Sequence, residues 1–277
     1  GAGFEDVYLI KTDASGNKVW EKTFGETNSD DGHSVQQTTD GGFVIAGHTE
    51  SLDNEFQVYL IKTDASGNKV WEKTFGGTNS EHGYSIQQTT DGGFVIAGGT
   101  SSFGATNLDF YLIKTDASGN KVWEKTFGGT NSEHGYSIQQ TTDGGFVIAG
   151  GTSSFGATNL DFYLIKTDAS GNKVWEKTFG GTNPEHGHCV QQTTDGGFVI
   201  AGYAESLDNG FQVYLIKTNA SGNKVWEKTF GGTNSEYGYS VQQTTDGGFV
   251  IAGYTSSFGA GHSDVYLIKT DASGEVK

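Results

Sequence analysis

The chain has 277 residues, with 33 acidic side chains against 17 basic ones, a formal net charge of −16 and a single Cys. Every basic residue is Lys, so the chain lacks the basic patch of a nucleic-acid-binding protein and the guanidinium groups that clamp phosphates and carboxylates. One Cys excludes an intramolecular disulfide and a Cys-rich zinc site, and no apolar window reaches the ~18–20 residues of a membrane-spanning helix.

The dominant feature of the sequence is an internal repeat, which must be found before local structure is assigned. Trp occurs at positions 20, 71, 123, 175 and 226, a spacing of 51 or 52 residues. Residues 59–131 are identical to residues 111–183 at all 73 positions. YLIKT occurs six times and DGGFVIAG five times, so the chain is an array of five repeats with one half-repeat counted twice.

Within one repeat, four short strands are predicted in chain order. The first covers residues 84–90 and ends at the hairpin signal Asp-Gly-Gly, and the second is the continuously apolar Phe94–Ala97. A loop, TSSFGATNLD, leads to the third strand at Phe110–Ile113. After the turn DASGN, the fourth strand, Lys121–Phe127, alternates between two faces.

Strands of this kind need neighbours on both sides. A continuously apolar strand in the middle of an antiparallel sheet must be covered on both faces, and one repeat of about 50 residues cannot do this alone. Four strands repeating at this period are typical of propeller blades. We therefore predict an all-β, five-bladed β-propeller with four antiparallel strands per blade, as a single domain over 1–277, with the five Trp side chains between blades.

The two ends of the array should form one blade. The chain begins at a third strand and ends just after another, so the closing blade is predicted to be shared by residues 1–26 and about 237–277. Its fourth strand is Lys18–Phe24, and its third is either Tyr8–Thr12 or Tyr266–Thr270. The surplus strand either remains at an edge or pairs with another molecule by strand exchange, in a protein that is otherwise expected to be monomeric.

The string FGGTNSEHGYSIQQTTDGGFVIAGGTSSF resembles the bacterial and archaeal β-propeller repeat of the SBBP type, and all five repeats have it. The resemblance implies blade architecture and a place in secreted or surface-attached multidomain proteins of prokaryotes. It specifies no activity. The chain departs from that family in its TSSFGATNLD loop, which lacks the usual Pro, and in having five repeats. The N-terminal residues do not show the pattern of a signal peptide.

An acidic residue enters each first strand, and these positions are the candidate ion site. If the first strands are innermost, the carboxylates circle one mouth of the central channel, where like charges repel unless water or a cation intervenes. A solvated acidic rim and a site for a divalent cation, with neighbouring His side chains as ligands, both fit this pattern. The candidates are Asp30, Glu81, Glu133, Glu185, Glu236, His82, His134 and His186.

The loops between the second and third strands fall into two classes. Repeats two, three and five have TSSFGA, with Phe103, Phe155 and Phe258, whereas repeats one and four have ESLDN, with Leu52 and Leu207. Exposed apolar side chains on such loops either contact sugar rings or partner proteins, or fold back to cover the blade edge. We expect the second arrangement.

Catalysis has little support in the sequence. The Asp residues of the DASG and DGG turns are explained by turn capping, which Asn219 performs equally well in one repeat. Cys189 aligns with Ser in the other repeats, and polar groups recur in near-identical copies, whereas an active site needs groups in different roles. We predict no enzymatic activity and no obligatory cofactor.

The function that the sequence favours is a non-enzymatic secreted or cell-surface propeller that acts as a binding or display module for carbohydrate or a surface protein. A structural spacer or self-associating repeat domain of a larger surface protein is an alternative, and a cation-binding propeller is another. Nucleic-acid binding and membrane insertion are not expected.

Overall fold

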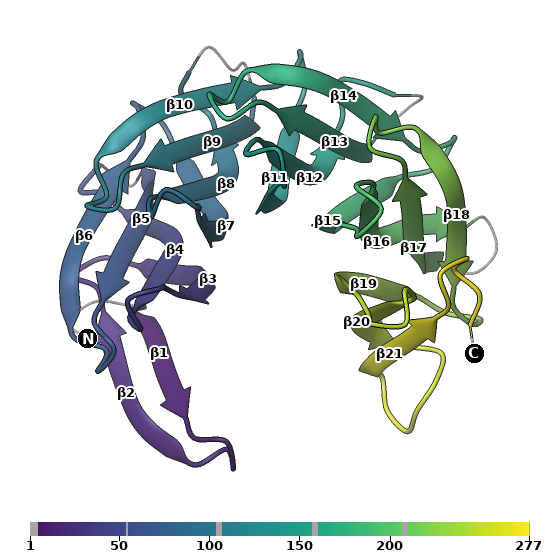
Figure 1. Ribbon diagram of the computed structural model, residues 1–277, viewed down its shortest axis with the longest axis horizontal. Helices are drawn as coiled ribbons and strands as arrows, with labels where there is room; N and C mark the ends of the chain where they lie inside the picture. The colour runs from purple at the N-terminus through teal and green to yellow at the C-terminus, as the bar shows by residue number, and fades with distance from the viewer. Residues whose placement is uncertain (1–4, 54, 104–106, 157–159, 207–209, 277) are drawn as a thin grey trace. The chain divides into compact units, whose positions relative to one another are not determined.

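A computed structural model describes residues 5–53, 55–103, 107–156, 160–206 and 210–276. These residues form 21 strands in six antiparallel sheets, and the described part of the chain contains no helix (Figure 1). The chain divides into two compact units, Gly1–Thr130 and Asn131–Lys277, which are described separately. The predicted all-β class with repeated four-stranded antiparallel sheets is confirmed.

The N-terminal unit contains three sheets. The first is a two-stranded hairpin of β1 (Val7–Thr12) and β2 (Lys18–Phe24). Repeat one forms the second sheet, with β3 (Asp30–Gln37), β4 (Phe43–Glu50), β5 (Phe56–Thr63) and β6 (Lys69–Phe75) in chain order. Repeat two forms the third, with β7 (Glu81–Gln88), β8 (Phe94–Thr100), β9 (Asp109–Thr115) and β10 (Lys121–Phe127).

The C-terminal unit contains the other three sheets. Repeat three forms β11 (Glu133–Gln140), β12 (Phe146–Thr152), β13 (Asp161–Thr167) and β14 (Lys173–Phe179). Repeat four forms β15 (Glu185–Gln192), β16 (Phe198–Ser206), β17 (Gly210–Thr218) and β18 (Lys224–Phe230). Repeat five has three strands, β19 (Glu236–Gln243), β20 (Phe249–Thr255) and β21 (Asp264–Thr270).

The predicted closing blade is not formed. Strands β1 and β2 pair only with each other, while β21 pairs with β20 in a separate three-stranded sheet, so the described strands make open sheets and no ring-closing ladder. Both claimants to the third-strand position thus pair with the strand next to them in sequence. Short hairpin loops explain this outcome, because closing a short loop costs less chain entropy than joining the two ends of the chain.

Turn chemistry sets the strand boundaries. In the Asp91-Gly92-Gly93 hairpin, Gly92 has a φ of 83°, which a side chain would oppose, and the Gly93 N–H donates to the Asp91 carboxylate at 3.0 Å. In the DASGN turn, the Asp116 carboxylate accepts from the backbone N–H groups of Ser118 and Asn120, each at 2.9 Å. Asn219 accepts the matching bonds at 3.0 Å in repeat four, so the predicted capping role is confirmed.

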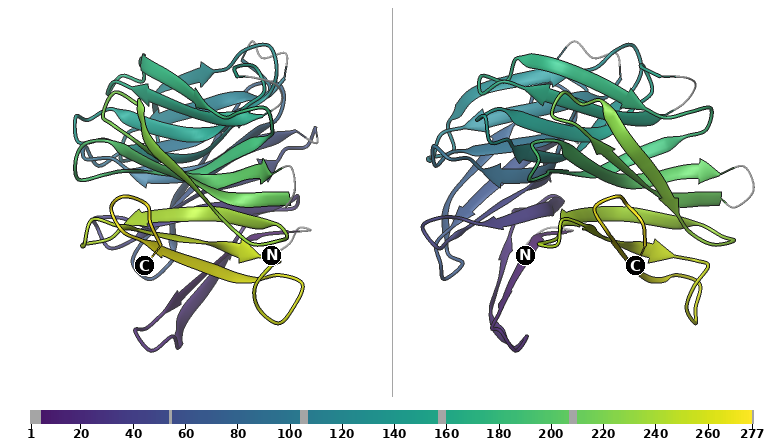
Figure 2. Two further views of the ribbon diagram at one scale, coloured as in Figure 1. Left: turned by 90° about the vertical axis from the view of Figure 1, so that its right-hand side faces the viewer. Right: turned by 45° about the vertical axis from the view of Figure 1, so that its right-hand side comes forward.

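Within each unit, neighbouring sheets stack face to face (Figure 2). In the N-terminal unit, Leu60 of β5 and Phe94 of β8 lie in one buried cluster and are 0% and 1% exposed. In the C-terminal unit, Leu215 of β17 and Ile251 of β20 pack in the same way. Every residue of β8 and β12 is buried, as the continuous apolar runs predict.

The repeated Trp side chains are less buried than predicted. Each lies on a fourth strand, which is the outer strand of its sheet, and is only partly buried. Trp71 still contacts the next sheet edge to face, with its ring centroid 5.8 Å from that of Phe94, and Trp226 contacts Phe249 at 5.7 Å. Trp71 and Trp226 therefore pack at the outer margin of the neighbouring sheet and are not part of its buried cluster.

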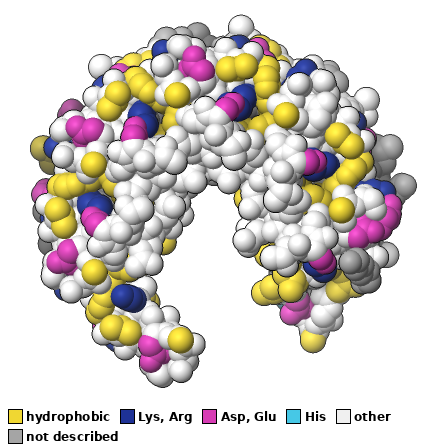
Figure 3. All heavy atoms as spheres, in the orientation of Figure 1, with side chains coloured by type: hydrophobic (Ala, Val, Ile, Leu, Met, Phe, Trp, Pro, Cys, Tyr) yellow, Lys and Arg dark blue, Asp and Glu magenta, His cyan; other side chains and the backbone are white. Residues whose placement is uncertain are grey.

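Each full sheet also contains an ion pair that the sequence did not predict. A nearly buried Lys of the third strand reaches the Asp of the DGG hairpin, as in Lys62–Asp40 at 2.9 Å and Lys217–Asp195 at 2.9 Å. Figure 3 shows Lys and acidic side chains next to one another over successive sheets on the face in view. These pairs balance part of the acidic charge locally.

Candidate binding site

The acidic residues that enter the first strands are buried, which corrects the expected solvated rim. Their exposed fractions range from 0 to 7%. The five residues are Asp30, Glu81, Glu133, Glu185 and Glu236. A carboxylate in this position must be held by hydrogen bonds, because a buried charge without partners is costly.

In the repeats with TSSFGA loops, a Thr of the second strand supplies such a bond. The Thr hydroxyl donates to the Glu carboxylate at 2.8 Å in Thr100–Glu81, Thr152–Glu133 and Thr255–Glu236. Glu236 also accepts from the N–H groups of Gly232 at 2.9 Å and Ser257 at 3.1 Å. Burial alone would raise the pKa of Glu236, but these hydrogen bonds together lower it.

The two repeats with ESLDN loops depart from this arrangement. In repeat one the acid is Asp30, one methylene shorter, and it accepts from the Glu26 N–H at 3.0 Å. In repeat four Ala204 stands at the Thr position, so Glu185 has no hydroxyl beside it. Glu185 accepts from the Gly181 N–H at 3.0 Å, while its other oxygen, Oε2, is buried without a hydrogen-bond partner. Burial, with a contribution from Asp161, raises the pKa of Glu185 to about 7.

The candidate His ligands make aromatic contacts. His82 stacks on Tyr84 with 5.9 Å between ring centroids, His134 stacks on Tyr136 at 5.8 Å, and His186 stacks on Tyr203 at 4.6 Å. Burial lowers the pKa of His186 to about 4, so the ring is neutral near pH 7. Among the described residues, no three His, Cys, Asp or Glu side chains converge as a metal site, so the cation site expected at these positions is not formed by them.

The environment of Cys189 does not favour a reactive thiol. Cys189 is partly buried, and burial raises the pKa of its thiol, which disfavours the reactive thiolate. No helix in the part of the chain that the structure describes is long and apolar enough to cross a bilayer.

The loop Phe side chains fold back onto their own sheets, as expected. The ring centroids of Phe103 and Tyr111 are 5.3 Å apart, and those of Phe155 and Tyr163 are 5.4 Å apart. The Phe rings remain 36–48% exposed, so each covers its Tyr at the surface and is not part of the core. The sequence pointed to the loops, but it did not identify the Tyr of YLIKT as the residue that they cover.

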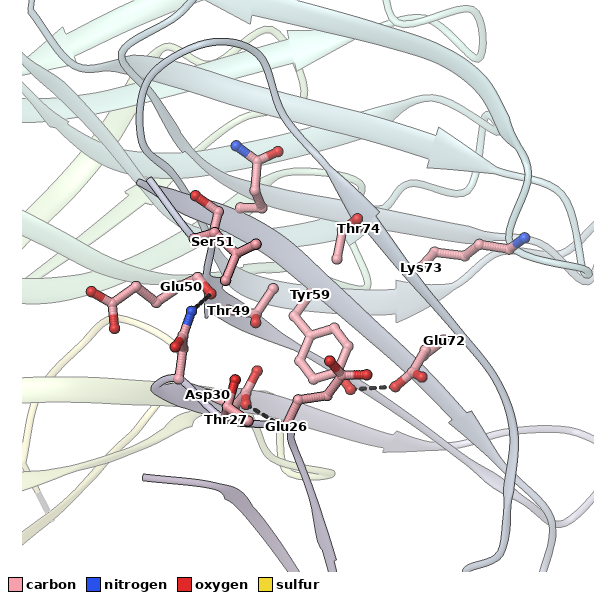
Figure 4. Close-up of a pocket in the computed structure, with 13 residues that line it drawn as sticks. Glu26, Thr27, Asp30, Thr49, Glu50, Ser51, Tyr59, Glu72, Lys73 and Thr74 are labelled. Carbon is pink, nitrogen blue, oxygen red and sulfur yellow. Dashed lines mark hydrogen bonds between the residues drawn. The ribbon is translucent and has the colours of Figure 1, made fainter. Parts of the chain in front are cut away.

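In repeat one no loop Phe lies on the equivalent Tyr59, which is buried all the same, with 5% of its surface exposed. Leu52, which stands at the Phe position, is 90% exposed and turned to solvent. Beside Tyr59 lies a pocket of about 460 Å³, whose lining is shown in Figure 4. The Tyr59 hydroxyl donates to Glu72, and the Lys73 side chain extends away from the ring in this view. The lining contains four carboxylates, from Glu26, Asp30, Glu50 and Glu72.

A second pocket lies at the same place in repeat four. It has a volume of about 430 Å³ and is lined by Tyr214, Glu185 and Ala204 among others. The Tyr214 hydroxyl donates to Glu227, which also accepts from Lys224 at 2.8 Å. Leu207 lies outside the described residues. These two pockets lie in the two repeats that have ESLDN loops. The sequence did not predict a pocket in either repeat.

A protein-family model matches most of the chain. The family model described as HfaD, holdfast attachment protein D, matches residues 6–255. Among curated proteins, the regulatory protein FlaEY of Caulobacter vibrioides is 24% identical over 217 residues, which is 63% of this chain and 23% of that protein. The chain therefore spans about a quarter of the length of that relative.

Solved structures show a similar fold. A protein of unknown function from Dyadobacter fermentans matches with a TM-score of 0.58 and 11% identity over 98% of this chain and 83% of its own. A mutant puromycin hydrolase matches with a TM-score of 0.55 and 14% identity over 90% of this chain and 39% of its own. At these identities the likeness concerns the fold alone.

Proposed function

Because the chain belongs to the family of holdfast attachment protein D, we propose that it is a non-enzymatic attachment or display module at the bacterial cell surface. The family match over residues 6–255 supports this proposal. The repeated sheets fit the role, since they present equivalent loops on a stiff scaffold. The resemblance to SBBP-type repeats and a secreted or surface location are parts of the same proposal.

The partner in this proposal is carbohydrate. The pocket beside Tyr59 is lined by carboxylates, hydroxyls and amides, which together accept and donate the hydrogen bonds that sugar hydroxyls make. The test uses the whole chain, immobilised and exposed to a panel of purified bacterial surface polysaccharides and neutral oligosaccharides. Saturable binding to at least one member supports the proposal. Hydrolysis of a panel member by the chain, or an absence of binding across the panel, overturns it.

Self-association is a second candidate function, favoured by the terminal sheet. In β21, Val265 and Leu267 are 87% and 68% exposed, whereas Leu215, at the position of Leu267 in β17, is fully buried. A bare strand with an apolar face is a template for another chain. Solution mass measured from low to high protein concentration tests this role, and a constant monomer mass would contradict it.

The cation-binding alternative has a simple test. A bound divalent ion would stabilise the folded state through ligand linkage. The melting temperature of the whole chain is therefore compared with calcium and with a chelator. Equal values in both solutions would exclude this role.

A further inference from the structure

Neighbouring repeats in the C-terminal unit are joined by apolar contacts between their sheets. On the side of the next repeat, repeat four presents Val199 and Ala201 of β16 and Leu215 of β17. Repeat five covers them with side chains that include Val241 of β19 and Phe249 of β20. All five side chains are at most 5% exposed. This contact shows what covers a complete sheet on that side.

Repeat five has the same face, on the side away from repeat four, but this face is not buried in the described part of the chain. Val250 and Ala252 stand at the positions of Val199 and Ala201, yet Val250 is only partly buried and Ala252 is exposed. Both repeats contain FVIAG, so the difference lies in what packs against the strand. Repeat five therefore presents an uncovered copy of a surface that the chain buries elsewhere.

Repeat one lacks the complementary cover on its opposite side. Val35 of β3 is 55% exposed, whereas Ile86 and Val241, at the same position in repeats two and five, are 7% and 5% exposed. Ile86 is covered by β4, the second strand of the preceding sheet. The hairpin of β1 and β2 corresponds to a third and a fourth strand only, so among the described strands it offers Val35 no second strand. A pocket of about 100 Å³ lies at this place, lined by Val35 and by Leu9 of β1.

Polar groups on the first strands match in the same way. The Gln88 N–H of β7 donates to Gln36 Oε1 of β3 at 2.5 Å, and an equivalent bond joins β19 to β15. In repeat five the acceptor position is Gln242, whose side chain is exposed. In repeat one the donor position is Gln37, which is also exposed. One surface therefore has the acceptor, and the other has the donor, of a bond that joins neighbouring repeats.

The strand that lies between these two surfaces is present twice in the chain. Residues 6–16 and 264–274 both read DVYLIKTDASG, so β20 can pair with β1 in the register that it uses with β21. The two copies are held differently, because Leu9 of β1 is 9% exposed and packs on repeat one, whereas Leu267 of β21 is 68% exposed. An exchange therefore replaces one ladder with an identical ladder, and β21 is the strand that leaves.

In the single chain β1 pairs only with β2, and β20 pairs only with β19 and β21. From the matching surfaces and the repeated strand, we propose that copies of this chain associate head to tail, with β20 of one copy paired to β1 of the next. The joint sheet has four strands in the order β19–β20–β1–β2, like the complete sheets. Val250 and Ala252 cover Val35 of the next copy, and Gln242 accepts from its Gln37 N–H.

The contact uses different surfaces on the two copies, so it is heterologous and joins further copies into chains or rings. It also removes the uncovered faces of repeats five and one from water, which is the favourable term of the association. This inference rests on the self-association proposed above, because it assigns the surfaces and the strand register of that role.

Two engineered disulfides provide the main test, in a Cys189→Ser background that removes the native thiol. Residues directly opposite each other in an antiparallel pair are close enough for a disulfide. Val250 lies opposite Lys269, so Val250→Cys with Lys269→Cys locks β21 onto β20. Val250→Cys with Lys11→Cys instead links β20 to β1, because Lys11 stands at the position of Lys269. Circular dichroism checks that each variant is folded.

After mild oxidation, the variant with Cys at 250 and 11 should form dimers and longer species on a non-reducing gel. The locked variant should have a dissociation constant for self-association raised about tenfold or more in sedimentation experiments, and reductant should restore the wild-type value. If the wild-type chain stays monomeric at every concentration, the proposed self-association fails together with this inference. If the wild-type chain associates and the locked variant associates equally well, only this inference fails. A cross-linked product of monomer mass alone, or no cross-link, would overturn the pairing of β20 with a second copy.

Two substitutions of exposed Val residues locate the interface. Val35→Asp should raise the dissociation constant about tenfold or more, because the assembly buries the new carboxylate. Val265→Asp on β21 is the matched control and should not raise it, because β21 leaves the sheet. Val35 and Val265 are 55% and 87% exposed in the single chain, so neither change should unfold it. Equal effects of the two substitutions, or weaker association only for Val265→Asp, would overturn the assigned surface.

Discussion

Repeats four and five share the YLIKT and FVIAG strand sequences, but the surroundings of the Tyr in YLIKT differ between them. In repeat five, Phe258 covers Tyr266, and Thr255 holds the buried Glu236. In repeat four, a pocket lies beside Tyr214, and Glu185 has one unsatisfied oxygen. Repeats four and five therefore differ in two features, the ring that the loop supplies and the hydroxyl that satisfies the acid. In repeat one a pocket also lies beside Tyr59, but Thr49 stands at the Thr position there and the acid is the shorter Asp30.

The largest expected effect is the loss of the carboxylate in repeat five. Glu236→Ala leaves the donors of Thr255, Gly232 and Ser257 without their acceptor, and should lower the free energy of unfolding by about 3 kcal/mol. Glu185→Ala is the matched control and should cost less, because that carboxylate has fewer partners. Urea denaturation of both variants provides the measurement, and equal losses would break the comparison.

Removal of the loop Phe ring should have a smaller effect. Phe103→Ala exposes Tyr111 and deletes a half-buried aromatic contact. It should lower the free energy of unfolding, measured by urea denaturation, by about 1–2 kcal/mol. Leu52→Ala, at the same position of repeat one, should change stability by less than about 0.5 kcal/mol because Leu52 is exposed. If Leu52→Ala lowered the free energy of unfolding as much as Phe103→Ala, the two loop classes would contribute equally to stability and the comparison would fail.

Restoring the missing hydroxyl should give repeat four the buried hydrogen bond that repeat five has. Ala204→Thr places a donor beside Glu185 and should raise stability by about 1 kcal/mol, measured at pH 8 where the carboxylate is charged. The pKa of Glu185 should fall at the same time. Carboxyl titration followed by NMR measures this shift, and an unchanged pKa would contradict the role given to Ala204.

A further expected effect is a pH dependence specific to repeat four. The pKa of Glu185 is raised to about 7 in the folded chain, above the ordinary value of 4.5, so the folded state favours the protonated form. Its contribution to stability is therefore present below pH 4.5 and is lost as pH rises through 7. Between pH 6 and 8 the wild-type chain should lose stability relative to Glu185→Gln. If the free energy of unfolding changed with pH in the same way for both proteins, the pKa of Glu185 would not be raised.

Much of the fold could be predicted because its signals are local and repeated. The DGG and DASGN turns fix the hairpins, and the apolar runs such as Phe94–Ala97 identify strands that are covered on both faces. The pairing of the terminal strands could not be predicted, because β1 and β21 share the sequence YLIKT and differ only in where they lie along the chain.

The site was harder to predict for a different reason. The acids at the start of the first strands were identified, but their burial depends on hydrogen bonds with Thr100 and its equivalents, which lie on another strand. The substitution at Ala204 was visible in the repeat alignment, and it becomes informative only once Thr and Glu are known to touch. The loop Phe rings fold back as the sequence predicts, but the pocket beside Tyr59 depends on how separate strands and loops pack, which no local pattern shows.

The exchangeable loops have a consequence at the level of the gene. Loops of both classes are flanked by strands of the same sequence, YLIKT on one side and FVIAG on the other. Unequal recombination between such repeats can therefore exchange one loop class for the other without altering the FVIAG and YLIKT segments. A lineage can in this way vary the number of repeats of each loop class in one chain while the shared strand segments stay under unchanged selection for folding.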